Sequence, residues 1–399
     1  MKNKGPLSGI TVIDLTAMIS GPVCTMMLGD QGADVIKIEP LTGELTRKVG
    51  ASKNGMTTSF LCANRSKRSL TLNLKDPKGI TVLKKLITKA DVLVQNFRPG
   101  AMKRMGLSYG EVKKLNKEII YTSISGFGEK GPYSNQRVYD PVIQALSGLA
   151  DIQRDQKTNF PKMVRTIIPD KTTGMAAAQA ISSALFYKER YGTGQHIKLA
   201  MLDVMVAYLW PEGSSSLSFV GEEGDPSKGQ MGLDLVFQTK DNKYITAGAV
   251  TDKEWLGMCN AFDRKDLLSD PRFNTPRARF DNKTERRLLI AEEIKKHNSI
   301  DILTKLHENE VPSAPILSRT ELLENEQIIE NNIIEFHDSK FFGNIRSPRP
   351  APIYSDSPIN GKQLAPLLGQ NSIEILKEID YKDHEIKNLL QEKVTSSID

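Results

Sequence analysis

One carboxylate stands out in the sequence because a helix is expected to begin beside it. Asp170 follows two β-branched residues and a proline, and it precedes a run of small residues from Met175 to Leu185 that predicts a helix. An aspartate at the N-cap accepts hydrogen bonds from free backbone N–H groups and lies at the positive end of the helix dipole, so its carboxylate stays ionised at neutral pH. Asp170 is therefore expected either to cap the helix and do nothing more, or to serve as a nucleophile.

Basic side chains recur where strands of the predicted sheet end. Arg98 follows the strand expected at residues 91–96, and Arg104 comes shortly after it. Ligands of open α/β sheets bind at the carboxyl ends of the strands, and arginine suits phosphate oxygens there. A small ligand that carries phosphate is one interpretation, and ordinary solvated surface arginines are the other.

The remaining reactive side chains disfavour several enzyme classes. All five histidines lie at or after His196, and the chain contains no H-E-x-x-H or C-x-x-C pattern. The three cysteines are far apart, which fits reduced thiols better than a disulfide framework or a zinc site. A Ser-His-Asp hydrolase and a zinc enzyme are therefore disfavoured, and no metal site is predicted.

The elements that must position these residues begin with a βαβ unit. Apolar runs predict strands at 10–15 and 35–39 and a helix at 23–30 between them, with Ser20 as its N-cap and Pro22 at N1. Further strands are predicted at 69–74, 91–96, 119–124 and 196–202, with helices at 77–87, 142–150 and 172–190. This alternation indicates an α/β fold with a parallel sheet. The first turn lacks G-x-G-x-x-G, so no nicotinamide cofactor is implied.

Length and composition indicate a globular protein of about two domains. The 399 residues exceed the usual size of a single core, and the chain is 39% hydrophobic and 26% charged, without an apolar run long enough to span a bilayer. The formal charge of +6 is spread along the chain, which gives little support to nucleic-acid binding. The amino-terminal residues show no targeting pattern, so a cytoplasmic protein is expected.

Shifts in composition suggest where the domains meet. We predict a large Rossmann-like domain at 1–205, a linker at 206–220, and a smaller α+β domain at 221–325 in which a hairpin around Asp241 precedes three helices. Residues 326–399 are predicted to return to the large domain, first as an extended segment at 345–355 and then as two helices at 372–379 and 383–393.

Several motifs, in one order along nearly the whole chain, resemble those of a known family. They are Pro6 to Asp14, Gly21-Pro22, Gly32 to Glu39, Lys67 to Ser69, Ala90 to Gly100, Gly126 to Gly128, Asp170 with Gly174, and Gly192 to Gln195. Together they look like the class III CoA-transferases, also called the CaiB/BaiF family. The resemblance implies a Rossmann-like large domain built from both ends of the chain, a small domain between them, and a homodimer of interlocked subunits with long linkers such as 212–232.

The resemblance also implies roles for individual residues. Asp170 matches the catalytic aspartate of the family. Positions where the family contacts coenzyme A are occupied by Leu72, Lys75, Asn96, Phe97, Arg98, Arg104, Arg137 and Tyr139. The implied activity is the transfer of coenzyme A from an acyl-CoA donor to a free carboxylic acid, through an aspartyl anhydride and an aspartyl-CoA thioester on Asp170. The CoA thioester is then a substrate, and no permanently bound cofactor is expected.

Two other functions stay open beside this one. The related acyl-CoA racemases use a histidine and an aspartate for proton exchange, but here Tyr139 stands where the histidine is expected, and tyrosine is a poor base near pH 7. A CoA-binding protein without activity is the second alternative. Formyl-CoA transferases carry a glutamine where this chain has Ile19, which disfavours formate and oxalate, whereas lysines and arginines near the acyl pocket would favour dicarboxylates such as succinate.

Overall fold

The computed structural model describes residues 5–155, 158–221, 234–359 and 364–398. The chain divides into a large unit, residues 1–229 with 333–399, and a small unit, residues 230–332. These boundaries differ by several residues from the predicted limits of the small domain at 221 and 325. Residues 206–209, assigned to a linker from the sequence, are the end of a helix, and residues 222–233 of the expected long linker lie outside the described residues.

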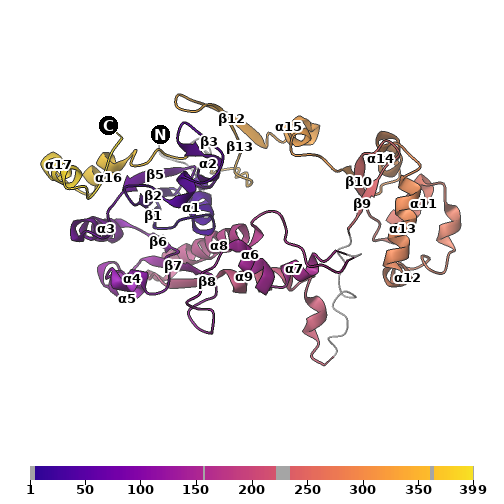
Figure 1. The fold of residues 1–399 in the computed structure, drawn as a ribbon, viewed down its shortest axis with the longest axis horizontal. Helices are drawn as coiled ribbons and strands as arrows, with labels where there is room; N and C mark the ends of the chain where they lie inside the picture. The colour runs from indigo at the N-terminus through magenta and orange to yellow at the C-terminus, as the bar shows by residue number, and fades with distance from the viewer. Residues whose placement is uncertain (1–4, 156–157, 222–233, 360–363, 399) are drawn as a thin grey trace. The chain divides into compact units, whose positions relative to one another are not determined.

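A sheet of parallel strands forms the centre of the large unit (Figure 1). In the order in which they pair, its strands are β5 (Lys67–Thr71), β2 (Asp34–Glu39), β1 (Thr11–Asp14), β6 (Val92–Gln95), β7 (Ile120–Ser125) and β8 (His196–Ala200). Every pairing in this sheet is parallel, so the predicted α/β class with a central parallel sheet is confirmed. The direction of strand addition reverses between β1 and β6, and ligands of such sheets bind beyond the carboxyl ends of the strands at that point.

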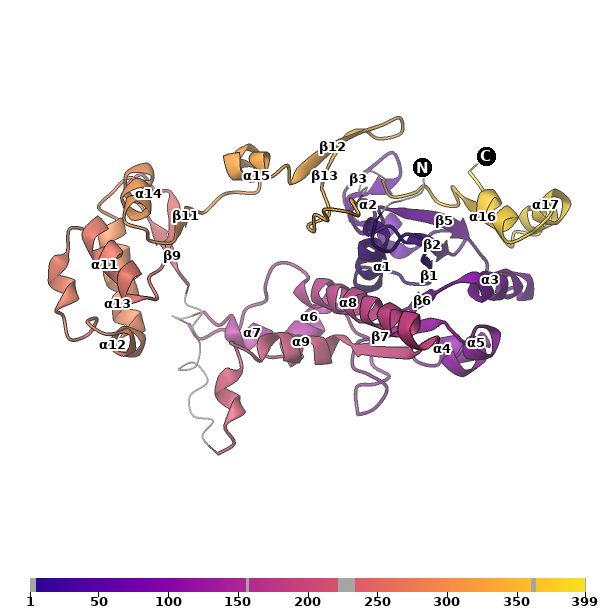
Figure 2. The ribbon, with the colours of Figure 1, turned by 180° about the vertical axis from the view of Figure 1, so that it is seen from behind.

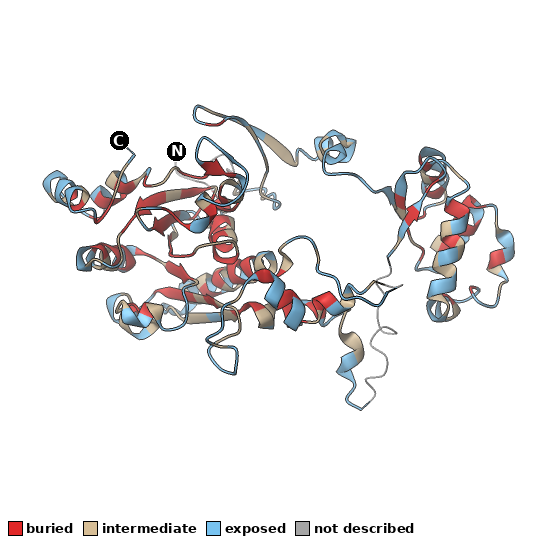
Figure 3. Cartoon of the chain, in the orientation of Figure 1, coloured by how far each residue is buried: buried red, intermediate tan, exposed pale blue. Residues whose placement is uncertain are grey.

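Helices cover both faces of this sheet (Figure 2). Val12 belongs to a core formed with α1 (Ser20–Asp30) and α8 (Ile168–Tyr191). Its neighbour Ile13 points the other way, into a core formed with α3 (Pro77–Lys89), α5 (Tyr109–Leu115), α16 (Ser372–Glu378) and α17 (Asp383–Gln391). Burial on both faces explains why these strands read as continuous apolar runs, and Figure 3 shows the buried residues concentrated there.

Residues near the carboxyl end cover the edge strand β5. The N–H of Asn371 donates to the carbonyl of Ser69 (3.0 Å), and the N–H of Asn73 donates to the carbonyl of Val394 (2.8 Å). The two helices predicted in this region are present as α16 and α17. The segment before them is not simply extended, as predicted for 345–355, because β12 (Ile334–Ser339) and β13 (Gly343–Pro348) form an antiparallel hairpin.

The small unit combines an antiparallel sheet with helices around a core of its own, to which Trp255 and Phe273 belong. The hairpin predicted around Asp241 joins its first two strands. The strands are β9 (Val236–Gln238), β10 (Tyr244–Ala247) and β11 (Ser313–Pro315), and the helices are α11 (Asp252–Ala261), α12 (Pro276–Asp281), α13 (Lys283–Ile294), α14 (Ser299–Glu308) and α15 (Glu326–Glu330).

Several local boundaries differ from the predictions. α1 begins at Ser20, so Ser20 is not its N-cap and Pro22 is its third residue. The helix predicted at 142–150 is interrupted by Gly148, whose φ of +87° suits glycine and separates α6 (Asp140–Leu146) from α7 (Leu149–Ile152). The other strands and α-helices of the large unit are β3 (Ser52–Lys53), β4 (Met56–Thr57), α2 (Thr58–Ala63), α4 (Ala101–Arg104) and α9 (Met201–Leu209). None of the helices in the described residues has the length and apolar character needed to cross a membrane.

Candidate active site

A short loop between β1 and α1 lies where the strand order reverses. The side chain of Asn96, just beyond β6, holds this loop, because its Oδ1 accepts from the N–H of Ala17 (2.9 Å) and its Nδ2 donates to the carbonyl of Ala17 (2.8 Å). Met18 in the same loop has a φ of +69°, a left-handed conformation that residues other than glycine rarely adopt. The carboxyl ends of β1 and β6 thus place a fixed loop where a ligand of the sheet is expected.

Asp170 lies in the first turn of α8, against the start of α1. It is the third residue of α8, whose N-cap position is Ile167, so the prediction that Asp170 is the N-cap is wrong. A Cβ on Gly174 would lie 2.8 Å from the carbonyl oxygen of Ser20, so glycine allows the two helices to approach this closely. The hydroxyl and the backbone N–H of Ser20 act on the carboxylate of Asp170 and favour its ionised form.

A second carboxylate, that of Asp140, is buried beside Asp170. Asp140 is the first residue of α6, and its Oδ2 accepts a hydrogen bond from the backbone N–H of Asp170 (3.1 Å). Its Oδ1 accepts from Nε2 of Gln144 (2.7 Å), and Oε1 of Gln144 accepts from the N–H of Val164 (3.0 Å). Asp140 therefore satisfies a free N–H at the start of α8, which is the task that the sequence predicts for Asp170 itself.

The environment of Asp170 raises the pKa of its carboxyl group. Burial disfavours the charged form, and the negative charge of Asp140 acts in the same direction, while the hydrogen bonds from Ser20 lower the pKa in part. The resulting pKa of Asp170 is about 6. The group is still largely ionised at pH 7, but it is more basic than an ordinary aspartate, which makes the ionised form a stronger nucleophile.

The residues predicted to contact coenzyme A gather mainly after β5 and β6. Leu72 and Lys75 follow β5, and Asn96 to Arg98 follow β6, so both groups lie beyond the carboxyl ends of parallel strands. Leu72 is only 1% exposed, so its side chain belongs to the core and only its backbone can face a ligand. The side chains that the structure leaves exposed are those of Lys75, Phe97, Arg98, Arg104, Arg137 and Tyr139.

Ser20 and Asp140 are site residues that the sequence reasoning missed. From the sequence, Ser20 is interpreted only as a cap and Asp140 is assigned no role. A proline follows each of them within two positions, a pattern typical of helix starts. The starts of α1, α6 and α8 meet at Asp170, and such a meeting of helix starts far apart in the sequence becomes visible only in the structure.

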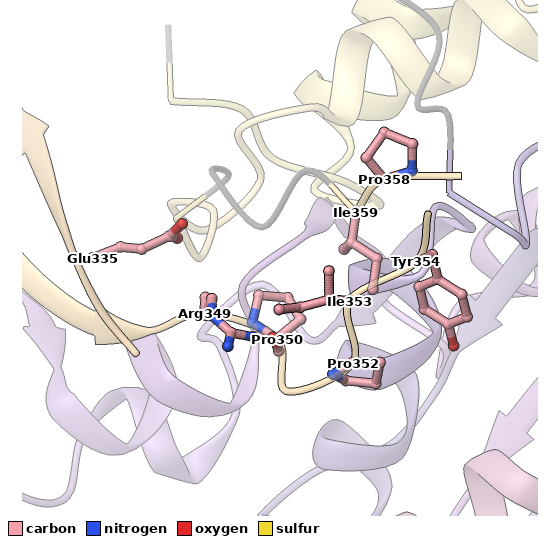
Figure 4. A pocket seen from close by; sticks show the side chains of 8 residues that line it. All are labelled: Glu335, Arg349, Pro350, Pro352, Ile353, Tyr354, Pro358 and Ile359. Carbon is pink, nitrogen blue, oxygen red and sulfur yellow. Dashed lines mark hydrogen bonds between the residues drawn. The ribbon is translucent and has the colours of Figure 1, made fainter. Parts of the chain in front are cut away.

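A small pocket elsewhere in the large unit does not coincide with this site (Figure 4). It has a volume of about 140 Å³ and lies beside the hairpin of β12 and β13. Its lining residues are Glu335, Arg349, Pro350, Pro352, Ile353, Tyr354, Pro358 and Ile359. None of the site residues predicted from the sequence lines this pocket, so we do not assign the chemistry to it.

Comparisons with known proteins point to one family. The model of the family described as CoA-transferase family III matches residues 7–372. The chain is 34% identical over 397 residues to succinyl-CoA:glutarate CoA-transferase of Homo sapiens, which covers 98% of this chain and 90% of that protein. It is 33% identical to succinate–glutarate CoA-transferase of Agrobacterium fabrum, with 94% and 96% of the two chains covered.

A solved structure agrees with this assignment. The crystal structure of a CaiB/BaiF family protein from Brucella suis matches with a TM-score of 0.80 and 29% sequence identity, over 94% of this chain and 100% of that one. The shared fold and the relatives named above extend over almost the full length of the chain. The chain therefore belongs to CoA-transferase family III, the CaiB/BaiF family.

Proposed function

We propose that this CoA-transferase moves coenzyme A from an acyl-CoA donor to a free carboxylic acid, with Asp170 as its nucleophile. The observation that carries this proposal is the carboxylate of Asp170, which lies against the start of α1 at Ser20 and which burial and the charge of Asp140 make more basic. It stands beside the loop after β1, where the sheet is expected to bind its ligand. A carboxylate that is ionised at pH 7 and held in one orientation fits nucleophilic catalysis.

The proposed reaction needs no net gain or loss of protons or electrons. A carboxylate oxygen of Asp170 attacks the thioester carbon of the donor, the C–S bond breaks, and coenzyme A leaves as a thiolate, so that a mixed anhydride remains. The thiolate attacks the aspartyl carbonyl carbon, the anhydride C–O bond breaks, and the donor acid leaves an aspartyl-CoA thioester behind. The acceptor carboxylate then runs both steps in reverse. Every intermediate is an activated acyl group, so no ATP is required.

Side chains near the ends of β5 and β6 suit the remainder of coenzyme A. We propose that the exposed Arg98 and Arg104 bind phosphate oxygens and that Phe97, which is 37% exposed, offers an apolar surface. Lys75, Arg137 and Tyr139 are exposed as well, and we propose the same ligand for them. Asn96 would act through the loop that it holds, and Leu72 through its backbone.

Dicarboxylic acids are the substrates that we propose for the acyl exchange. Two relatives at 33–34% identity are named for succinate or succinyl-CoA together with glutarate. Ile19 occupies the position where formyl-CoA transferases carry a glutamine, which supports an acid larger than formate.

We also propose that two copies form an interlocked homodimer, as the family resemblance implies. Large apolar side chains on α8 and α9 support this, because Phe186, Tyr191 and Tyr208 are each at least 60% exposed in the single chain. Large apolar side chains left exposed are typical of surfaces that another protein covers. A second copy of the chain is the proposed cover.

The pH dependence of the reaction is a direct consequence of the pKa of Asp170. We expect log kcat/KM to fall with decreasing pH below about pH 6, because the protonated carboxyl group cannot attack the thioester. The variant Asp140→Asn removes a negative charge that raises this pKa, so the acid limb of the profile should move to lower pH. Initial rates of acyl exchange between pH 4.5 and pH 8 measure the limb. An acid limb that stays in place in Asp140→Asn would contradict its assignment to Asp170.

Mass spectrometry of the CoA products tests the proposed function as a whole. The protein is mixed in heavy water with succinyl-CoA or acetyl-CoA and a panel of mono- and dicarboxylic acids. We expect new acyl-CoA masses, with dicarboxylic acids such as glutarate as the preferred acceptors. Deuterium in the recovered acyl group without any new acyl-CoA would overturn the proposal in favour of a racemase. Binding of the CoA thioesters with neither product would overturn it in favour of a binding protein without activity.

A further inference from the structure

Buried side chains hold the backbone of the loop between β1 and α1 residue by residue. Asp14 accepts a hydrogen bond from the N–H of Thr16 (2.8 Å), and the Nζ of Lys37 donates to the carbonyl of Thr16 (3.0 Å). Both polar groups of Ala17 are bound by Asn96, as described above. Side chains from β1, from β2 and from the residue after β6 thus fix these two residues through their hydrogen bonds.

Glu44 extends this arrangement to Met18. Its Oε2 accepts a hydrogen bond from the N–H of Met18 (2.7 Å), and its Oε1 lies 2.9 Å from the Nζ of Lys37. The side chains of Lys37 and Glu44 are 0% and 3% exposed, so the ion pair is shielded from solvent. The other charged groups next to Glu44 are Glu39, whose Oε2 accepts from the N–H of Glu44 (3.2 Å), and its partner Arg47.

The conformation of Met18 decides where the start of α1 lies. Met18 has a φ of +69°, which a residue with a side chain keeps only when its surroundings hold it there. Only Ile19 separates it from Ser20, the first residue of α1. Ser20 also adjoins the first turns of α8, because a Cβ on Gly174 would lie 2.8 Å from its carbonyl oxygen, so a change in the backbone at Met18 displaces Ser20 relative to Asp170 directly.

We propose that Glu44 is a positioning residue for the transfer reaction, because it fixes Met18 and thereby keeps Ser20, at the start of α1, in place beside Asp170. This inference rests on the proposed role of Asp170 as the nucleophile. In this proposal Glu44 does not contact the substrate and acts only through the loop between β1 and α1. Lys37 is its support, since the buried ion pair holds the carboxylate of Glu44 in place.

A change at Glu44 could act on Asp170 through charge or through position, and the two act in opposite directions. Loss of a negative charge, or an unpaired Lys37, favours the ionised form of Asp170 and moves the acid limb of the pH–rate profile to lower pH. Loss of the hydrogen bonds from Ser20 disfavours the ionised form and moves the limb to higher pH. Asp140, the charged group that faces Asp170 from α6, is unchanged in either case.

The test compares Glu44→Ala, Ser20→Ala and the double variant in the acyl-exchange assay. We expect Glu44→Ala to move the acid limb to higher pH and to lower kcat by about 10- to 100-fold at pH 6, with little change in KM for the acyl-CoA. Ser20→Ala should move the limb in the same direction. The double variant should move it no further than the larger single effect, because both changes remove the same influence of Ser20 on Asp170. Glu44→Gln, which keeps an acceptor for Met18, should rescue most of the activity.

Several outcomes would overturn this role of Glu44. A limb that moves to lower pH would show an effect of charge alone, and a uniform loss of activity at every pH with additive effects would show a purely structural role. If Glu44→Ala fails to fold by circular dichroism, Asn96→Ala supplies the same measurement, since it loosens the same loop at Ala17 and should move the limb in the same direction. Failure of the proposed function is distinguishable, because the native protein would then form no new acyl-CoA, and failure of the role of Asp170 would leave the exchange intact in Asp170→Asn.

Discussion

Asp170→Asn is expected to slow acyl exchange at least about a thousandfold, because an amide cannot form the anhydride or the aspartyl-CoA thioester. The amide has nearly the same size as the carboxylate and keeps an acceptor oxygen that faces Ser20, so the start of α1 should stay in place. Binding of coenzyme A, measured by isothermal titration calorimetry, should change little. The exchange rate and the binding constant together separate loss of chemistry from loss of the site.

A covalent adduct gives the same prediction a second readout. The native protein, incubated with acyl-CoA and no acceptor, should gain the mass of coenzyme A less one water on the peptide that contains Asp170, and hydroxylamine should remove the adduct. Asp203→Asn is the matched control, because Asp203 is also the third residue of a helix, α9, but is exposed. This control should keep full exchange and the adduct. Exchange that persists at the native rate in Asp170→Asn would refute Asp170 as the nucleophile.

Lys67→Met is expected to lower the free energy of unfolding of the large unit by about 3–5 kcal/mol. The Nζ of Lys67 lies 2.9 Å from Oδ2 of Asp14 and also donates to Asn64 Oδ1 (2.8 Å) and the carbonyl of Pro22 (2.9 Å). The side chains of Lys67 and Asp14 are 0% exposed. Burial alone would raise the pKa of Asp14, but the positive charges of Lys67 and Lys37 bring it down to about 2. Removal of Lys67 therefore leaves a buried carboxylate without its main partner.

Urea unfolding followed by circular dichroism measures this effect. Lys198→Met is the control, because the ion pair of Lys198 with Glu129 is more than half exposed on both sides and should contribute at most about 1 kcal/mol. The double variant Asp14→Asn with Lys67→Met should recover part of the loss, since it removes both charges. If Lys67→Met had the same free energy of unfolding as Lys198→Met, the buried pair of Lys67 and Asp14 would contribute no more to stability than an exposed pair.

The strands and helices of the large unit were largely predictable, because burial on both faces makes each strand an apolar run and gives each helix a recognisable start. The strands at 10–15 and 91–96 illustrate this, since each is within two residues of the observed limits at both ends. The hairpin of β12 and β13 was missed because most of its residues are at least partly exposed, so no clear alternation of apolar and polar residues marks it.

The candidate site was predictable only in part. Asp170 is marked by its position before a run of small residues, and the resemblance to a family strengthens that assignment. Its two neighbours were not predictable, since Ser20 lies 150 positions earlier in the chain and nothing local distinguishes it from an ordinary helix start. The prediction that Asp170 is an N-cap failed for the same reason, because Asp140 approaches from another helix to bind the N–H that a cap would satisfy.

The way in which the final residues cover β5 has a consequence for synthesis on the ribosome. The N–H of Asn73 donates to the carbonyl of Val394, and the face of the sheet that includes Ile13 packs against α16 and α17. Both therefore stay uncovered until these late residues have been synthesised. The ribosome therefore releases the complete small unit before the large unit can close its hydrophobic core. Until then the edge of β5 is uncovered and can pair with strands of other chains. The nascent chain is therefore most prone to aggregation late in translation, which is the stage at which we expect a chaperone to help most.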